Sequence, residues 1–238
     1  MINNLMGIKL GMTTLFSEHG DMIPVTLIQA GPCPIVRIKN KEIDGYVAVQ
    51  LAYGTVKEKN VNKPLAGYFK KYNIKPHRWL KEFRIDSIDG IQQGQEIKVD
   101  IFSEGDLVNV SGITKGKGFQ GVVKRHNFGG GPRTHGQSDR QRAPGAIGSQ
   151  RPQRVKKGTR MAGHMGHVWR TIRNLEVIKV FPEKNLIAVK GSAPGPNNSL
   201  VILTKTKKKI THKVVPTAVK KERIKTKGKP PKEAPKKK

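Results

Sequence analysis

Cysteine is almost absent from this chain of 238 residues, and long apolar runs are missing. The single cysteine, Cys33, excludes a disulfide within the chain and fits a reducing compartment, so we expect it to be a small packing residue. No segment approaches the ~18 consecutive apolar residues that span a membrane. Residues 1–16 also lack the charged region and long apolar run of a signal peptide. We therefore expect neither a disulfide-stabilised scaffold nor a membrane protein.

Acidic residues are scarce relative to basic ones. The chain has 46 Lys and Arg against 17 Asp and Glu, which gives a formal net charge of +29 at pH 7. Residues 1–114 carry 14 basic and 12 acidic side chains, residues 115–203 carry 17 and 3, and residues 204–238 carry 15 and 2. The excess charge therefore lies outside a near-neutral body, and its size favours a polyanionic partner.

The body and residues 171–205 have the pattern of a β-rich domain. Hydrophobic residues make up 35% of the chain, which is enough for one sizeable core. Residues 5–16 and 22–30 predict a hairpin around His19, Gly20 and Asp21. One helix is predicted at 63–72, with Asn62 as its N-cap. Further strands are predicted at 34–38, 46–53, 79–85, 91–102, 106–114, 171–181, 185–191 and 199–205. Short strands with Gly and Pro between them favour a barrel or a sandwich.

Residues 114–170 are too long, too glycine-rich and too basic for an ordinary connection. Residues 115–170 hold 13 Lys or Arg and one acidic residue, Asp139. Predicted strands of one core flank this stretch, so it is an insertion within a domain. Gly, Pro, Ser, Thr and Gln separate its cations, which suits an extended backbone lying between phosphates. Aromatic residues are only 5% of the chain, which favours phosphate contact over base stacking. We expect an arm that a polyanion orders.

Other sites fit this stretch less well. A G-x-G-x-x-G pattern is formed by Gly116, Gly118 and Gly121, but the glycines at 129–131 would end the required helix early. His164 and His167 lack the cysteines and acids of a zinc site. Ser138, Asp139 and a histidine lack the nucleophile elbow of a hydrolase. We expect no catalytic site, metal or cofactor. The alternative for the charge run is a solvated, disordered segment.

Six blocks, in order along the chain, carry a family resemblance: MGIKLGMTTLF, GDMIPVTLI, KGKGFQGVVKRHNF, THG, PGAIG and GTRMAGHMG. Together they resemble the universal large-subunit ribosomal protein three family of the bacterial type, from residue 1 to about 205. The resemblance implies a mainly β fold, with a six-stranded translation-protein-like barrel, a small α-containing insert and a long extended RNA-binding arm. It implies a body of residues 1–113 and 167–215 with an insert at about 55–85, and an arm at 114–166. Residues 216–238 are a Lys/Pro-rich tail that we expect to be disordered or draped on RNA.

The resemblance also implies a function. It predicts a cytoplasmic, non-enzymatic constituent of the large ribosomal subunit that binds ribosomal RNA near its 3′ end and nucleates early assembly. The arm would run toward the peptidyl-transferase centre, and the fourteenth and nineteenth large-subunit proteins would be neighbours. No membrane or small-molecule substrate is expected.

The predicted RNA-binding residues are the basic and polar side chains of the arm. They are Lys115, Lys117, Lys124, Arg125, His126, Arg133, His135, Arg140, Arg142, Gln150, Arg151, Arg154, Lys156, Lys157, Arg160, His164, His167 and Arg170. Residues 145–154 match the arm tip of the family. Some members carry a methylated glutamine there, and Gln150 is the nearest candidate, although the local sequence GSQRPQRV is one residue shorter. Two rivals stay open: an RNA chaperone or assembly factor, and an enzyme that uses the barrel.

Overall fold

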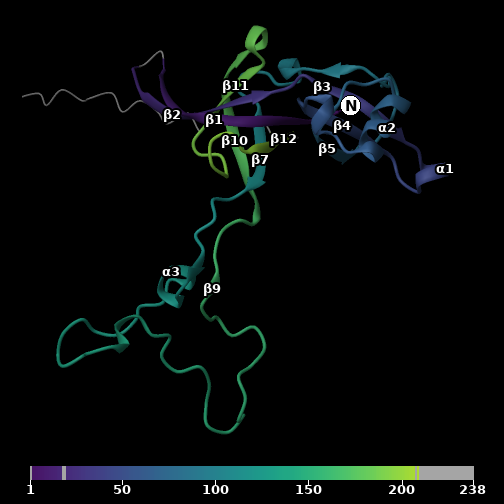
Figure 1. The fold of residues 1–238 in the computed structure, drawn as a ribbon. Helices are drawn as coiled ribbons and strands as arrows, with labels where there is room; N and C mark the ends of the chain where they lie inside the picture. Colours follow the sequence, from purple (N-terminus) through teal and green to yellow (C-terminus); the bar gives the residue numbers. More distant parts are fainter. Residues whose placement is uncertain (1, 18–19, 207, 209–238) are drawn as a thin grey trace, which may run out of the picture.

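The computed structural model describes residues 2–17, 20–206 and 208 and is mainly β, as predicted. Figure 1 shows three parts: a barrel, a second sheet beside it, and a long arm that projects away from both. The barrel holds β1 (Asn4–Phe16), β2 (Met22–Ala30), β7 (Leu107–Ile113), β10 (Trp169–Phe181), β11 (Leu186–Lys190) and β12 (Leu200–Lys205). The predicted tail, residues 216–238, lies outside the described residues.

The barrel is a closed ring of six strands in the order β1-β12-β7-β10-β11-β2. Each neighbouring pair is antiparallel. The predicted hairpin is present, with Phe16 opposite Met22, although residues 18–19 of its loop lie outside the described chain. The closing pair joins Asn4 to Thr204 and so brings the two ends of the body together. Closure satisfies backbone donors and acceptors that an open sheet would leave at its edges.

Alternating aliphatic side chains fill the barrel. Val108 and Val110 of β7 are fully buried, whereas their neighbours on the strand are partly exposed. Leu5, Ile28, Ile187 and Leu203 are buried from other strands. Burying each such side chain stabilises the fold by roughly 1.5–3 kcal/mol.

A second sheet occupies the chain between β2 and β7. Its order is β5 (His77–Arg84), β4 (Ala48–Thr55), β3 (Cys33–Lys39), β6 (Glu96–Ile97). The sheet begins at β3 and ends at β6, and so extends on both sides of residues 55–85. Val49 and Leu51 of β4 pack in the same apolar cluster as the barrel residues Leu5 and Ile28. The sheet and the barrel thus share one core.

Helices are short throughout. The predicted helix is confirmed as α2 (Lys63–Lys71), and its residue Phe69 is buried. Asn62 occupies the N-cap position without a side-chain hydrogen bond. The predicted strand 91–102 is wrong over most of its length, since it forms only β6 and a 3-10 helix, η2 (Val99–Ile101). Gly94, at φ +83°, lies in the turn that interrupts it. The remaining helices of the body are α1 (Lys41–Asp44), η1 (Glu58–Asn60) and η4 (Pro182–Lys184).

Lys9 anchors a loop at the barrel end from which the arm leaves. Its Nζ donates hydrogen bonds to the carbonyl oxygens of Ala193 at 2.8 Å and Gly195 at 3.1 Å. Burial first, and then the nearby charge of Lys115, lower the pKa of Lys9. Gly195 has no room for a side chain, because a Cβ there would lie 2.7 Å from the oxygen of Ile113. The loop therefore packs directly against the root of the arm.

Candidate nucleic-acid interface

The arm begins where two barrel strands run past the barrel. The pairing of β7 with β10 places Ile113 opposite Trp169. Thr114 N then donates to Val168 O at 3.0 Å, and Val168 N lies 3.3 Å from Thr114 Oγ1. The barrel thus fixes where the arm leaves the body, between β7 and β10.

Residues 114–121 and 161–168 form a two-stranded stem. Lys117 N donates to Met165 O, and Met165 N donates to Gly118 O, both at 2.9 Å. A short ladder, β8 (Phe119–Gln120) with β9 (Gly163–His164), extends the pairing. Gly166 has φ +77°, and a Cβ there would collide with the carbonyl oxygen of Lys115. Glycine at position 166 therefore allows the two stem strands to approach each other closely.

A helix that the sequence did not predict closes the stem. This helix, α3 (Val122–His126), ends at Asn127 in the left-handed conformation. Arg125 Nη1 donates to Met161 O at 2.7 Å, and His126 Nε2 lies 3.0 Å from the same oxygen. Gly163 leaves the space that the Arg125 guanidinium fills. These two residues, predicted only as RNA contacts, join the strands of the stem.

Beyond the stem the chain forms two lobes, which Figure 1 shows at the end of the arm. Residues 129–143 form the first lobe, closed by a hydrogen bond from Gly131 N to Gln141 O at 2.9 Å beside η3 (Arg140–Arg142). Residues 144–160 form the second lobe, held locally by Thr159 Oγ1, which donates to Lys156 O at 2.7 Å. The second lobe lies farthest from the barrel in Figure 1 and contains the predicted tip, residues 145–154.

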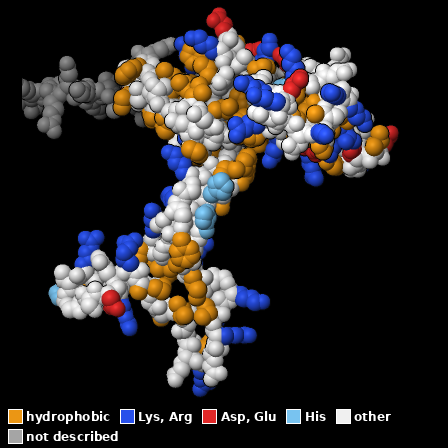
Figure 2. All heavy atoms as spheres, in the orientation of Figure 1, with side chains coloured by type: hydrophobic (Ala, Val, Ile, Leu, Met, Phe, Trp, Pro, Cys, Tyr) orange, Lys and Arg blue, Asp and Glu red, His pale blue; other side chains and the backbone are white. Residues whose placement is uncertain are grey.

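The structure spreads the predicted RNA-binding residues along the arm. All are exposed except the half-buried Arg125 and His126. The stem carries Lys115, Lys117, His164 and His167, α3 carries Lys124, and Arg170 lies at the root of the stem. The first lobe carries Arg133, His135, Arg140 and Arg142. The second carries Gln150, Arg151, Arg154, Lys156, Lys157 and Arg160. Figure 2 shows Lys and Arg side chains pointing outward from both lobes.

Among the described residues, the cations of the arm have no carboxylate partners. In the described part of the chain, all four ion pairs lie in the body: Arg37–Asp44, Lys39–Glu82, Lys190–Glu176 and Lys205–Asp106. The charges of the arm therefore repel one another over a narrow scaffold. Opposite charge from outside the chain would stabilise it.

A groove along the stem brings several of these groups together. Its lining includes Lys115, Lys117, Arg125, His126, His164 and Arg170, and no acidic residue. Such a groove suits the phosphate backbone of a nucleic acid. Across the described residues, no group of three or more His, Cys, Asp or Glu is placed to hold a metal ion. None of the described helices is long and apolar enough to cross a membrane.

The dinucleotide pattern does not form a dinucleotide site. Gly121 is the N-cap residue of α3, but this helix has only five residues, and the chain then enters the first lobe without a second parallel strand. The phosphate-binding fingerprint requires both a helix and a following strand.

Comparison with known proteins gives the arm and the barrel a family context. Residues 84–185 match the family model described as Ribosomal protein L3. The chain is 54% identical over 206 residues to the large ribosomal subunit protein uL3 of Chlorobaculum parvum, a match that covers 86% of this chain and 99% of the relative. For uL3 of Brachyspira pilosicoli the identity is 52% over 206 residues, covering 86% and 94%. For uL3 of Carboxydothermus hydrogenoformans it is 51% over 203 residues, covering 85% and 97%. Because this identity extends over nearly the whole of each relative, the chain belongs to the ribosomal protein L3 family.

Proposed function

We propose that this protein binds large-subunit ribosomal RNA through its arm and so organises the RNA during assembly of the subunit. As a member of its family, the chain is a structural, non-enzymatic protein of the large ribosomal subunit. The observation that carries the proposal is the unpaired charge of the arm. Residues 115–170 hold 13 Lys or Arg, and none of them has a carboxylate partner within the described chain.

The family resemblance supports a finer placement. We infer that the barrel is of the translation-protein kind and lies on the outside of the subunit, near the 3′-end domain of the RNA. The second lobe, with Gln150 and Arg151 near its tip, extends toward the peptidyl-transferase centre. The fourteenth and nineteenth large-subunit proteins are the proposed neighbours. Early binding at this position would make the protein a nucleator of subunit assembly in the cytoplasm.

Salt dependence of binding tests the role of the arm. Affinity falls as salt rises, and each phosphate contact that releases a counterion makes the slope of log affinity against log salt steeper by about 0.7–0.9. A variant with Lys115, Lys117 and Lys124 changed to Gln should therefore bind a large-subunit RNA fragment with a slope about two to three less steep. A slope that is unchanged in this variant would contradict binding through the arm.

An assembly factor or RNA chaperone is the second candidate, because such a protein would carry the same exposed charge. Sedimentation distinguishes the two. A resident subunit protein stays with mature particles in a moderate-salt wash, whereas a factor leaves them. Loss of the protein from mature particles under this wash would favour the factor.

A further inference from the structure

Residues 1–114 include a strongly basic segment, although their summed formal charge is close to zero. Residues 57–84 hold nine Lys or Arg and two acids, Glu58 and Glu82. Residues 85–106 hold six acids and one basic residue, Lys98. The two segments nearly cancel in the sum over residues 1–114, so the average charge of the body conceals a local excess that lies outside the arm.

The basic segment occupies one edge of the second sheet and the helix beside it. It comprises η1, α2 and β5, and β5 is the edge strand that pairs with β4. Side chains alternate along β5, so Arg78 and Arg84 lie on one face of the strand and Lys81 lies on the other. Phe69, only 1% exposed, anchors α2 to the sheet. All nine cations are exposed: Lys57, Lys59, Lys63, Lys70, Lys71, Lys75, Arg78, Lys81 and Arg84. We call this the α2–β5 surface.

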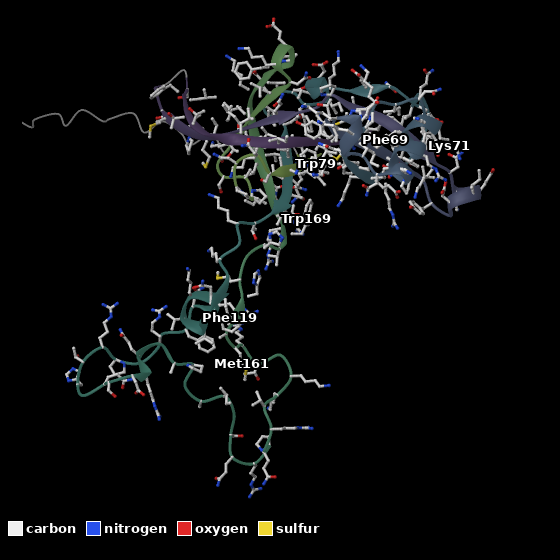
Figure 3. All side chains as sticks on the ribbon, viewed as in Figure 1. Phe69, Lys71, Trp79, Phe119, Met161 and Trp169 are labelled. Atoms are coloured by element: carbon white, nitrogen blue, oxygen red, sulfur yellow. The ribbon has the colours of Figure 1, made fainter. Side chains whose placement is uncertain are left out.

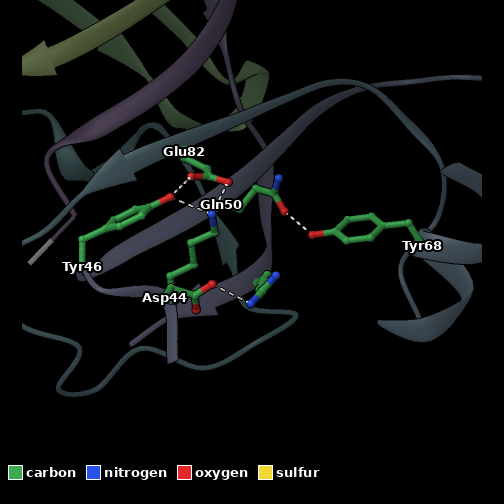
Figure 4. Close-up of polar contacts among 7 residues, drawn as sticks. Asp44, Tyr46, Gln50, Tyr68 and Glu82 are labelled. Carbon is green, nitrogen blue, oxygen red and sulfur yellow. Dashed lines mark hydrogen bonds and ion pairs between the residues drawn. The ribbon is translucent and has the colours of Figure 1, made fainter. Parts of the chain in front are cut away.

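The charge of the α2–β5 surface is not neutralised from within the described chain. None of its nine cations is among the ion-paired residues of the described part. One of its two acids, Glu82, is already engaged by Lys39 of β3 at 2.8 Å and accepts a hydrogen bond from Tyr46 at 2.8 Å (Figure 4). The hydrogen bond from Lys39 lowers the pKa of Glu82. Glu82 therefore stays ionised but serves a cation of the neighbouring strand.

Aromatic rings hold several of these cations in place. The guanidinium of Arg78 lies 4.7 Å from the centre of the Trp79 ring, and that of Arg84 lies 5.4 Å from the Tyr46 ring. Lys71 lies 5.9 Å from the Tyr72 ring. A ring face covered by a cation of the same chain is not free to stack on a nucleobase. The surface is thus suited to phosphates rather than to bases.

A groove on this surface has the lining that a phosphate chain needs. It lies between η1 and the start of β5 and is lined by Lys57, Lys59, Asn60, Asn62, His77 and Arg78, with no acid in its lining. Asparagine amides add neutral hydrogen-bond donors to the positive charge. A second hollow shares His77 and Arg78 with this groove and adds Lys75, although its lining also includes the acid Glu96.

The α2–β5 surface meets the arm at the arm root. Lys81 Nζ lies 4.8 Å from the centre of the Trp169 ring, the first residue of β10. Figure 3 shows Trp169 at the root of the arm and Trp79 of β5 above it, with Lys71 of α2 farther from the arm. A ligand held by this surface therefore lies beside the arm without occupying its lobes.

We propose that the α2–β5 surface is a second RNA-binding site, separate from the arm, that holds the phosphate backbone of a double-helical RNA segment. The inference rests on the proposed function in taking ribosomal RNA as the polyanion. Double-helical RNA is recognised mostly by shape and by backbone contacts, whereas single strands are gripped by aromatic stacking. Covered aromatic rings and unpaired cations match the first mode.

Charge-matched variants of the full chain test this site. The surface variant changes Lys57, Lys59 and Lys75 to Gln. The control variant makes the same three changes at Lys41, Lys98 and Lys184, which are exposed and lie outside both proposed RNA-binding surfaces. Each is titrated against a large-subunit RNA fragment and against a plain RNA duplex over a range of salt. Thermal unfolding checks that both variants remain folded.

On both RNAs, the slope of log affinity against log salt should be less steep by about two to three in the surface variant, because three phosphate contacts are removed. The control should keep the slope of the parent chain. Equal slopes for the surface variant, the control and the parent would overturn the proposal, and so would a change seen with the large-subunit RNA fragment but not with the RNA duplex. Loss of subunit incorporation without a change in slope would assign the surface to an acidic protein partner and also refute it.

The outcome is separable from that of the proposed function. If the slope becomes less steep in the arm variant but not in the surface variant, the arm binds RNA and the second site is refuted. If it becomes less steep in neither variant, both proposals fail. Crosslinking of assembled subunits gives an independent readout, since peptides from residues 57–84 should carry RNA adducts.

Discussion

Gly166 is the position where a single methyl group should disturb the arm most. Its φ of +77° lies in the left-handed region, and a Cβ would collide with the carbonyl oxygen of Lys115 on the opposite stem strand. An alanine in this conformation costs roughly 1–2 kcal/mol before any steric contact is counted. The Gly166→Ala variant must therefore either strain the stem or separate its strands.

The expected magnitude follows from that cost. If the bound arm requires the paired stem, a loss of about 1–2 kcal/mol weakens RNA binding roughly 5–30-fold. The amides of Lys117 and Met165, which cross the stem at 2.9 Å, should exchange hydrogen faster in the variant. The barrel does not depend on this contact, so its unfolding temperature should remain that of the parent.

A matched control lies in the second lobe. Gly148 has no positive φ, and a Cβ there would meet no heavy atom within 4 Å, so Gly148→Ala adds the same methyl group without strain. Hydrogen exchange of the stem should be unchanged in this control. If the stem amides of Gly166→Ala exchanged no faster than those of Gly148→Ala, the close strand approach at Lys115 would not govern the arm.

Three further perturbations have defined outcomes. Cys33 is fully buried, and this burial raises the pKa of its thiol to about 12, so alkylation at neutral pH should require denaturant; rapid labelling of the native protein would contradict this. Lys9→Met leaves two buried carbonyls without their donor and should lower the free energy of unfolding by about 1–3 kcal/mol in urea titrations, and an unchanged midpoint would refute the anchor. Changing Arg151, Arg154 and Arg160 together to Ala should reduce subunit yield more than removal of residues 229–238, as measured by gradient sedimentation; normal yield would count against a deep position of the second lobe.

Much of the barrel was predictable because its strands carry their own signal. Residues 22–30 and 199–205 are short aliphatic runs bounded by turn residues, and they form β2 and β12. The helix at α2 follows from Phe69 and its neighbours at helical spacing. The arm was predictable from composition, since no packed core can be built from its residues.

Pairing between distant segments was not predictable in the same way. The sequence pattern of residues 33–39 predicts a strand, but it does not predict that β3 lies between β4 and β6 and outside the barrel. The five-residue helix α3 is too short to show a hydrophobic period. The hydrogen bond from Arg125 to Met161 spans 36 residues of sequence, so a side chain that composition assigns to RNA is found to join the stem.

Charge summed along the sequence also differs from charge arranged in space. The sum over residues 1–114 is close to zero, yet Lys57 to Arg84 and Asp86 to Asp106 separate the two signs onto different segments. The stem shows the complementary effect. It carries Lys115 and Lys117 on one strand and is held by backbone hydrogen bonds, which do not depend on neutralising those charges. Its cations therefore remain available, and the same logic applies to the α2–β5 surface, where aromatic rings instead of carboxylates hold Arg78 and Arg84. In both places the fold positions positive charge without cancelling it, which is what a surface must do if its counter-ion is the phosphate of another molecule.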